Sequence, residues 1–359
     1  MKLKKLIAVA AAVVLSVASF AGCGSSGGKD KNEPDVTASG SGIEVTIEPA
    51  DGNSETAEST EPVNIAMLKG PTAIGAVMLM STHDNGTAEG NYNFVIDTAP
   101  DEVVSKIVSG EVDIAAVPSN SAAAIYNKTE GEVEVMAINT LGTLYLIENG
   151  DTINTAADLS GKTINSTGQG AVPEYVLNYL ISESGAENVS VNFMQTHAEL
   201  AAAVASGEAE NALLPEPFAE VALSKNPDLR VALDIAKNYD EYSQIEKGDM
   251  PNTLPMGCVV VRKDYAKENP AKVDLFLEEY KKSIEEVNAN VKEAAEYVVS
   301  YGIIDDLQVA ESAIPKCSIY YIDGEKMKDI MESFLNVMND ANPKSIGGKL
   351  PEDDFYYIK

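Results

Sequence analysis

Ser109-Gly110-Glu111 and Ser206-Gly207-Glu208 carry the same three residues, and the second triplet lies 97 positions after the first. Each triplet ends a stretch with the period of an amphipathic helix and precedes a short apolar run, which is the pattern of a helix followed by a strand. The same offset places Pro118 on Pro215, each at the end of its apolar run, where a helix is expected to begin. The sequence therefore predicts an internal duplication.

The same offset aligns longer stretches on either side of these triplets. Asn64 to Thr72 falls on Gly161 to Gln169, and both stretches are typical of a strand that leads into a turn and a helix. Tyr92 to Asp97 falls on Val189 to Met194, two strand-like segments. Each copy alternates strand and helix three times, which predicts a parallel sheet covered by helices with right-handed crossovers. The fold class is thus α/β with two similar lobes.

Further strand-like segments lie between and after the two copies. Val133 to Asn139 and Thr143 to Glu148 can carry the chain into the second lobe, and Gly257 to Arg262 can carry it back. Two crossings form a hinge, and two lobes on a hinge form a cleft. The predicted boundaries are 63–140 for the first part of lobe I, 141–256 for lobe II, and 257–359 for the return strand and C-terminal helices, mostly of lobe I. Helices are expected from Pro270, over Val291 to Tyr301 and over Lys326 to Met338.

The first residues have the charge and hydropathy pattern of an export signal. Lys2, Lys4 and Lys5 precede an apolar stretch that ends near Phe20 and is short for a membrane span. Small residues then lead into Cys23, which resembles a bacterial lipobox with phenylalanine where leucine is commoner. We expect residues 1–22 to be a signal peptide and Cys23 to carry a lipid that anchors the chain to the outer face of the cell membrane. The alternative is a secreted protein whose signal merely contains a cysteine.

Residues 23–61 differ in composition from the rest of the chain. They are rich in Gly, Ser, Thr, Pro and acidic residues, so they cannot bury enough apolar surface to fold, and we expect a flexible tether. No later run is long and apolar enough to span a bilayer. About 300 residues remain, which exceeds what one hydrophobic core usually supports and agrees with two lobes.

Charge and composition exclude several classes of function. A formal net charge of -30 argues against nucleic acid as a partner, because a phosphate backbone would be repelled. The two histidines, His83 and His197, have no cysteine or carboxylate at metal-ligand spacing and are expected at the surface. No nucleophile elbow, zinc-protease helix or phosphate-binding loop of an ATPase is present, so we expect neither an enzyme nor a bound cofactor. Cys258 and Cys317 can pair or remain as two buried thiols.

Several short motifs occur in the order found in one family of proteins. They are Gly70-Pro71-Thr72, Ser109 to Ile114 leading to Pro118-Ser119-Asn120, Asp158 to Lys162, Leu214 to Phe218, and Lys267 to Pro270. In this order the chain resembles the type II periplasmic-binding-protein fold, and within it the nitrate-, sulfonate-, taurine- and thiamine-precursor-binding families. The resemblance covers the chain from Val63 onward. It implies a monomeric protein that closes on a small molecule and delivers it to a membrane permease and its ATPase, which are other chains.

The ligand of such a sheet is expected beyond the carboxyl ends of the strands, where loops lead into helices. The duplication names these loops, and the first crossing adds two residues beneath the cleft. The candidate ligand-binding residues are Lys69, Gly70, Thr72, Ser119, Asn120, Asn139, Thr140, Thr167, Gln169, Gly170 and Glu216. Most have neutral hydrogen-bonding side chains beside helix N-termini, which favour an anionic group such as sulfonate, phosphate or carboxylate.

Each of these residues also has a purely structural interpretation. Thr72, Ser119 and Thr167 can cap their helices, and Lys69 can be a solvated lysine at the cleft edge. Glu216 can bind a cationic or hydroxyl group, or only stabilise a helix start. The ligand class expected is a small organic anion or heterocycle, with sulfonates ahead of thiamine-type pyrimidines. Two other functions stay open at this point: a ligand-sensing surface lipoprotein without a transporter, and a pyrimidine-synthase-like enzyme on the same fold.

Overall fold

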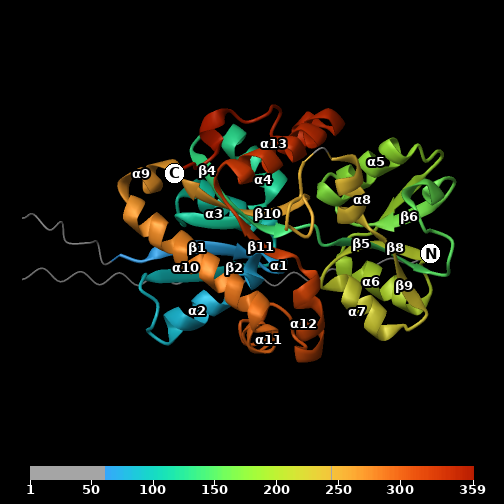
Figure 1. Ribbon diagram of the computed structural model, residues 1–359, viewed down its shortest axis with the longest axis horizontal. Helices are drawn as coiled ribbons and strands as arrows, with labels where there is room; N and C mark the ends of the chain where they lie inside the picture. The colour runs from blue at the N-terminus through green and yellow to red at the C-terminus, as the bar shows by residue number, and fades with distance from the viewer. Residues whose placement is uncertain (1–60, 244) are drawn as a thin grey trace, which may run out of the picture. The chain divides into compact units, whose positions relative to one another are not determined.

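Residues 61–243 and 245–359 are described by a computed structural model (Figure 1). The predicted signal peptide, residues 1–22, the lipidation site Cys23 and all but the last residue of the predicted tether lie outside the described residues. Among the helices of the described ranges, none has the length and apolarity that crossing a bilayer requires.

The N-terminal part of the described chain supplies four strands of a six-stranded sheet. Its elements are β1 (Val63–Leu68), α1 (Pro71–Ile74), α2 (Val77–Asp84), β2 (Tyr92–Asp97), α3 (Pro100–Ser109), β3 (Ile114–Pro118), α4 (Ser119–Lys128) and β4 (Val133–Leu141). The strand order is β11-β4-β10-β3-β1-β2. β1 is parallel to β2 and to β3, whereas β10 is antiparallel to both β3 and β4. The sheet is therefore mixed: the copy's own strands are parallel as predicted, and the returning strand is not.

Lobe II follows as a second set of strands wrapped by four helices (Figure 1). Its elements are β5 (Leu144–Asn149), η1 (Ala156–Leu159), β6 (Thr163–Ser166), α5 (Val172–Ser184), β7 (Ser190–Phe193), α6 (His197–Ser206), β8 (Asn211–Pro215), α7 (Phe218–Lys225), β9 (Leu229–Asp234) and α8 (Ile235–Tyr242). Parallel β6 and β7 form one pair, and β5 lies between β8 and β9, antiparallel to both.

Asn211 joins these two pieces of sheet in lobe II. Its side-chain oxygen accepts from the Asn165 N–H at 3.0 Å, and its side-chain nitrogen donates to the Thr163 carbonyl at 2.9 Å. Asp113 makes the matching contact in lobe I, where its carboxylate accepts from the Asn64 N–H at 2.9 Å. A buried side chain thus bonds the backbone of a neighbouring strand in both lobes, β1 in lobe I and β6 in lobe II, so the two copies share a structural device that few sequence identities reveal.

The predicted offset holds over part of the duplication. α3 and α6 begin and end 97 positions apart, as do β3 and β8, and glycines 110 and 207 end the two helices with φ of 76° and 80°. The offset fails after the first strand of each copy. α1 begins at Pro71 directly behind β1, but α5 begins only at Val172, because lobe II inserts a loop in which Gly168 and Gly170 take positive φ. Pro118 does precede α4 directly, but α7 begins three residues after Pro215.

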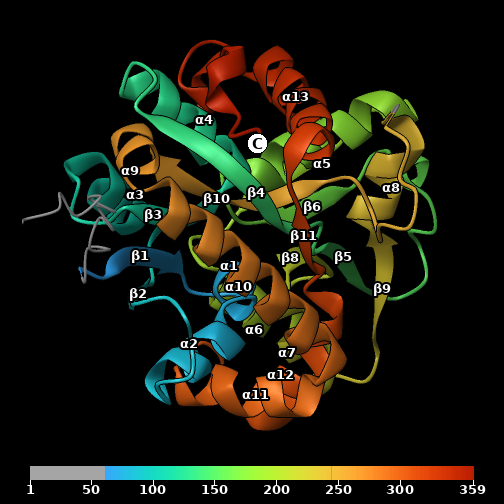
Figure 2. The same ribbon diagram turned by 60° about the vertical axis from the view of Figure 1, so that its left-hand side comes forward.

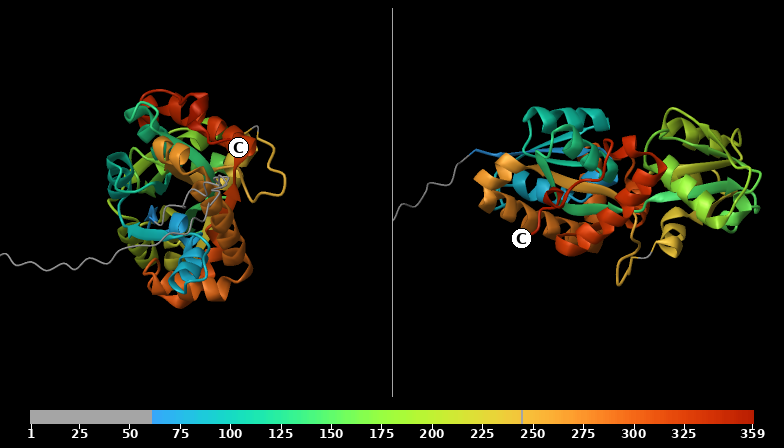
Figure 3. Two further views of the ribbon diagram at one scale, coloured as in Figure 1. Left: turned by 90° about the vertical axis from the view of Figure 1, so that its left-hand side faces the viewer. Right: turned by 90° about the horizontal axis from the view of Figure 1, so that it is seen from above.

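The C-terminal part returns to lobe I. Its elements are β10 (Pro255–Arg262), α9 (Lys263–Glu268), α10 (Pro270–Ala289), α11 (Val291–Ser300), α12 (Leu307–Ala313), η2 (Ile314–Lys316), β11 (Ile319–Ile322), α13 (Gly324–Ala341), η3 (Pro343–Ile346) and η4 (Asp353–Phe355). α10 and α11 lie against α2 on one face of the sheet, and α13 lies over α4 and beside α5 (Figures 2 and 3). α10 buries Val273, Phe276, Leu277 and Tyr280 on one side, the apolar stripe its sequence predicts.

Two apolar clusters occupy the two faces of the lobe I sheet. One gathers α2, α10 and α11 under β1 and contains Phe276 and Tyr280, both fully buried. The other contains Phe334 of α13 and continues into lobe II through Leu177 of α5. The β4–β5 connection and the segment from α8 to β10 are the two chain crossings between the lobes, as predicted.

Replacing Asn211 with alanine should destabilise the folded chain. The substitution leaves the part-buried Asn165 N–H and Thr163 carbonyl without their partners, so we expect a loss of about 1–2 kcal/mol in unfolding free energy. Asn192→Ala is the matched control, because Asn192 makes a single exposed side-chain bond to Asn165 and should cost less than about 0.5 kcal/mol. Urea unfolding measures both, and equal losses would contradict the bridging role of Asn211.

Candidate functional site

Thr72, Asn139 and Thr140 lie together at the carboxyl end of β1. Asn139 is 1% exposed, and its side-chain nitrogen donates to the Thr72 carbonyl at 3.2 Å and to the Tyr280 hydroxyl at 2.9 Å. Its side-chain oxygen accepts from the Thr140 hydroxyl at 3.2 Å. Thr72 itself donates from Oγ1 to the Leu68 carbonyl at 2.8 Å. The sequence predicts these three residues in one place, but gives no indication that Tyr280 of α10 completes the cluster.

Gly257 of β10 allows this cluster to pack against the returning strand. A Cβ at position 257 would lie 2.4 Å from Thr72 Cγ2 and 2.9 Å from Asn139 Oδ1, closer than real Cβ contacts. Only glycine therefore permits β10 to approach the Thr72 loop this closely. The second crossing of the hinge thus touches the first crossing and the β1–α1 loop at the same point.

Ser119 begins α4 directly behind β3 and is fully buried. Its Oγ has no well-formed hydrogen bond among the described residues, and the thiol of Cys258, a weak acceptor, lies beside it. Asn120, the next residue, donates from its side chain to the Ser345 carbonyl at 3.1 Å. The two adjacent candidates therefore differ: the Asn120 amide nitrogen is engaged by the C-terminal segment, and the Ser119 hydroxyl has only the Cys258 thiol beside it.

Thr167, behind β6, contacts a residue that the sequence analysis placed at the surface. Its Oγ1 lies 2.5 Å from Nδ1 of His197, the first residue of α6. The imidazole ring also packs against Phe218 with 5.1 Å between ring centroids. His197 is thus half-buried, and the expectation of a surface histidine is wrong for it. The rule that ligands lie beyond the carboxyl ends of strands also applies to β7, which precedes His197. This residue could therefore have been predicted from the sequence.

Gln169 and Gly170 are exposed and face a groove between α5 and α13. The groove has a volume of about 770 Å³ and includes Tyr175 and Asn342 in its lining. Asn342 donates to the Tyr175 hydroxyl at 3.0 Å, a contact between the C-terminal segment and lobe II. Gly170 donates its N–H to Glu174 at 2.5 Å. No partner for the Gln169 side chain is found among the described residues, so its amide is available at this edge.

Glu216 lies at the end of β8 and is 2% exposed. Burial raises the pKa of its carboxyl group to about 7, against the lowering effect of the Glu220 N–H bond and of the Lys316 ammonium group. Lys316, from the C-terminal part of the chain, forms an ion pair with Glu220 of α7. Tyr145 of β5 donates to the Lys316 carbonyl at 3.4 Å. Lys316, which the sequence analysis did not single out, therefore links the C-terminal helices to lobe II.

Lys69 and Gly70 complete the predicted set. Lys69 is exposed, and its backbone N–H donates to the Asp97 carbonyl at 2.8 Å. Gly70 has φ of 123°, which favours glycine at the start of α1. Asp97, at the carboxyl end of β2, forms an ion pair with Lys106 at 2.5 Å and keeps its other carboxylate oxygen buried without a partner in the described chain.

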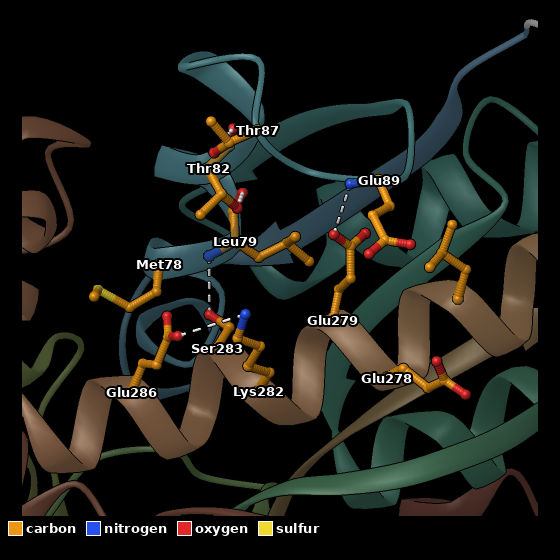
Figure 4. A pocket seen from close by; sticks show the side chains of 11 residues that line it. Met78, Leu79, Thr82, Thr87, Glu89, Glu278, Glu279, Lys282, Ser283 and Glu286 are labelled. Carbon is orange, nitrogen blue, oxygen red and sulfur yellow. Dashed lines mark hydrogen bonds and ion pairs between the residues drawn. The ribbon is translucent and has the colours of Figure 1, made fainter.

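A second groove lies apart from all of these residues, between α2 and α10 (Figure 4). It has a volume of about 230 Å³, and its lining includes Met78, Leu79 and several glutamates. Glu279 accepts there from the N–H groups of Glu89 and Gly90 and from the Tyr92 hydroxyl. This carboxylate holds the chain ahead of β2 in place, which explains its position without a ligand.

The described part of the chain shows no cluster of histidine, cysteine, aspartate and glutamate that could hold a metal ion. Cys258 and Cys317 are both buried and free, so of the two possibilities the sequence left open the structure has two thiols. Burial raises the pKa of each thiol, which keeps both in the unreactive neutral form.

The two lobes and the polar loops at their strand ends are also found in known proteins. The family model described as NMT1/THI5 like matches residues 89–294, more than half of the chain. The chain belongs to the NMT1/THI5-like family. This membership confirms the resemblance drawn from the order of its short motifs. A search of curated protein sequences found no match.

Solved structures share the fold of this family member. An ABC transporter from Parabacteroides distasonis has a TM-score of 0.69 at 24% identity, over 83% of this chain and 99% of that one. The periplasmic aliphatic sulphonate-binding protein SsuA of Escherichia coli has a TM-score of 0.65 at 14% identity, over 83% and 92%. The periplasmic nitrate-binding protein NrtA of Synechocystis PCC 6803 has a TM-score of 0.56 at 13% identity, over 79% and 84%. The predicted periplasmic-binding-protein fold is thereby confirmed.

Glu216 should make the stability of the protein depend on pH. Its pKa is about 7 in the folded chain against an ordinary value of 4.5, so the folded state holds a proton that the unfolded state has released. Unfolding free energy should therefore fall as pH rises from 5 to 8, by on the order of 2 kcal/mol. In Glu216→Gln, which cannot ionise, this part of the fall should be absent in urea unfolding at the two pH values.

Glu148→Gln is the matched control for that experiment. Burial acts to raise the pKa of Glu148, but hydrogen bonds from Ile153 and Thr152 and the charge of Arg230 outweigh it and lower the pKa. The stability that this carboxylate contributes is lost only below its ordinary pKa. Glu148→Gln should thus destabilise equally at pH 5 and pH 8, and an unchanged pH dependence in Glu216→Gln would contradict the assignment.

Proposed function

We propose that this protein is the extracytoplasmic solute-binding subunit of an ABC importer and that it captures a small organic anion between its lobes. Lobe I comprises residues 63–140 with 257–359, and lobe II comprises 141–256. We favour sulfonates over thiamine-type pyrimidines, the heterocyclic alternative, as the sequence analysis does. The membrane permease and the ATPase that drive import are other chains.

The observation that carries this proposal is the hydroxyl group of Ser119. It is fully buried and without a well-formed hydrogen bond, although a buried hydroxyl normally has one. It stands in the first turn of α4, a ten-residue helix directly behind β3. An oxyanion at this point would accept from the hydroxyl and from the free N–H groups of that turn, and the helix dipole would favour its charge.

The other candidates surround the same strand ends. In lobe I we assign ligand contacts to Lys69, Gly70 and Thr72, with Asn139 and Thr140 beneath them. From lobe II we assign Thr167, Gln169, Gly170 and Glu216. The bonds of Asn139 and Asn120 within lobe I suit them to orient the loops, and the unengaged side chains of Ser119 and Gln169 suit them to contact the ligand.

Proteins with this fold support a role in capture. SsuA is described as binding aliphatic sulphonates and NrtA as binding nitrate, two small anions that differ in shape. A fold shared at such low identity hosts different ligands by changing its loops. The ligand assigned to this chain therefore rests on its own strand-end loops, with the neighbours supporting only the general role.

Capture accounts for the site better than catalysis does. Its polar groups are hydroxyls, amides and one buried carboxyl group, and the pyrimidine-synthase-like alternative would require a cysteine-rich iron site. A ligand-sensing lipoprotein without a transporter would have the same cleft. Adjacent genes for a permease and an ATPase distinguish import from sensing, because a sensor would instead accompany a signalling protein.

The anchor belongs to this proposal as well. Lipid on Cys23 would hold a monomer at the outer face of the membrane, with residues 23–61 as the tether between the lipid and lobe I. Cys23→Ser should therefore release the protein from the detergent phase of a Triton X-114 extraction of expressing bacteria. A variant that stays in the detergent phase would contradict lipidation at Cys23.

A ligand of the proposed class should raise the melting temperature of residues 63–359. Since a ligand that binds only the folded state stabilises it by mass action, a thermal-shift titration identifies the class. We expect a dose-dependent rise with ethanesulfonate or taurine, and a smaller one with nitrate or 4-amino-5-hydroxymethyl-2-methylpyrimidine. A cooperative melt that none of these compounds shifts would contradict the proposed ligand classes.

Two alanine variants show whether that rise comes from the proposed site. Ser119→Ala removes no well-formed bond within the protein, so the unliganded melting temperature should stay nearly constant and the affinity should fall about tenfold or more. Ser109→Ala is the control, because Ser109 is exposed at the end of α3 and bonds only its own helix. Equal affinities in the two variants would remove Ser119 from the site.

A further inference from the structure

Three loops of lobe II converge at the carboxyl ends of neighbouring strands. Thr167 follows β6, His197 begins α6 behind β7, and Phe218 begins α7 behind β8. The Thr167 hydroxyl and His197 Nδ1 are 2.5 Å apart, and the rings of His197 and Phe218 are tilted by 39°. The imidazole is therefore fixed from two sides at the strand ends, where this fold class places its ligand.

The second ring nitrogen of His197 is not used by the protein. Nδ1 is bonded to Thr167, and no partner for Nε2 occurs in the part of the chain that the structure describes. The ring is half-buried, so Nε2 retains access to solvent. A threonine hydroxyl can donate to Nδ1 of the neutral ring or accept from it in the charged ring. When the hydroxyl donates to the neutral ring, the orienting contact survives a change in the charge of His197, and Nε2 carries a proton in both states.

The charged groups around His197 are engaged elsewhere. Glu199 of α6 accepts from the Thr196 N–H, Glu174 of α5 from the Gly170 N–H, and Glu220 of α7 is paired with Lys316. Glu216, at the end of β8, accepts from the Glu220 N–H. Burial lowers the pKa of His197, and no neighbouring carboxylate opposes this effect. The ring is therefore neutral at pH 7 and can gain a charge when an anion arrives.

We propose that His197 is a further ligand contact, which donates from Nε2 to the anionic group of the captured solute. The assignment rests on the proposed function and extends it, because it adds a donor from lobe II to the Ser119 hydroxyl of lobe I. Thr167 then acts as a positioning residue for the imidazole, and Phe218 packs against the imidazole ring and fixes its orientation.

Protonation of His197 should couple to anion binding. A bound anion favours the charged imidazole, so the ring has a higher pKa in the complex than in the free protein. Affinity for an anion should consequently increase as pH falls from the pKa in the complex towards the pKa in the free protein, and level off below it. Glu216 titrates near the same range, and Glu216→Gln removes its contribution from the measurement.

The chain offers a direct readout, since His83 and His197 are its two histidines. Carbon-13 HSQC spectra resolve the two ring signals, and His83→Asn assigns them. Ethanesulfonate is the probe, titrated at pH 6 and pH 7.5 into the wild type and into Glu216→Gln. We expect the His197 signal to shift saturably and its pKa to rise in the complex, while the His83 signal stays constant.

His197→Asn provides the matched variant, because asparagine retains a polar group near Thr167 and lacks Nε2. Its affinity for ethanesulfonate should be about tenfold lower at pH 6, the loss of one hydrogen bond to a charged group, and should vary less with pH than that of the wild type. A folding defect would be visible as a lowered unliganded melting temperature, and the NMR titration of the wild type does not depend on this variant.

The outcomes separate this inference from the proposed function. If ethanesulfonate raises the melting temperature while the His197 signal and pKa stay unchanged, His197 is not a contact and the capture function stands. If ethanesulfonate neither shifts the melting temperature nor any ring signal, the proposed anion class and this inference both fail.

Discussion

The side-chain amide of Asn139 joins the parts of the molecule on which the rest of the site depends. It lies on β4, the first chain crossing, and bonds the β1–α1 loop through Thr72 and helix α10 through Tyr280. Gly257 of β10, the second crossing, packs against the same group. Because the amide is 1% exposed, each bond that it fails to make would carry the full cost of desolvation. The hinge and the lobe I loop therefore have one common point of attachment. A ligand bound in that loop would act on it directly.

The two lobes hold their strand ends in place by the same means. Asp113 and Asn211 each use a buried side chain to bond the backbone of a neighbouring strand. The turns that follow these contacts, at Ser119 and at Glu216, are thereby anchored on one side. A preorganised set of donors requires less reordering when a ligand binds, so rigidity at these points favours affinity.

Much of the fold could be predicted from the sequence, because it depends on local patterns. The Ser-Gly-Glu triplets, the prolines behind the apolar runs and the apolar stripe of α10 each reflect the period of one element, and the structure agrees with them. The mixed sheet was harder to predict from the sequence, since the direction of β10 depends on a chain crossing that no local pattern encodes. The added loop before α5 was not predicted for a related reason. Two nearby glycines in a sequence are compatible with a single turn or with a longer loop.

The positions of the site residues could be predicted from the sequence, but the contacts that these residues make could not. The loop rule found Thr72, Ser119 and Thr167, yet their partners Tyr280, Cys258 and His197 come from distant parts of the sequence. Glu216 is the clearest case, because its identity suggested a charge or a cap, whereas its burial beside Lys316 makes it a carboxyl group that titrates near pH 7. Burial is a property of the folded chain, and so the chemistry of that residue became readable only in the structure.

The proposed capture requires that the lobes close on the ligand, and a distance measured across the two lobes tests this. Spin labels on cysteines at Lys128 of α4 and Lys225 of α7, both exposed, would report it by double electron–electron resonance, since the buried Cys258 and Cys317 are unreactive. Saturating ethanesulfonate should change the mean distance and narrow its distribution in residues 63–359, which lack Cys23. An unchanged distribution in a sample whose melting temperature rises with the same ligand would contradict capture by closure.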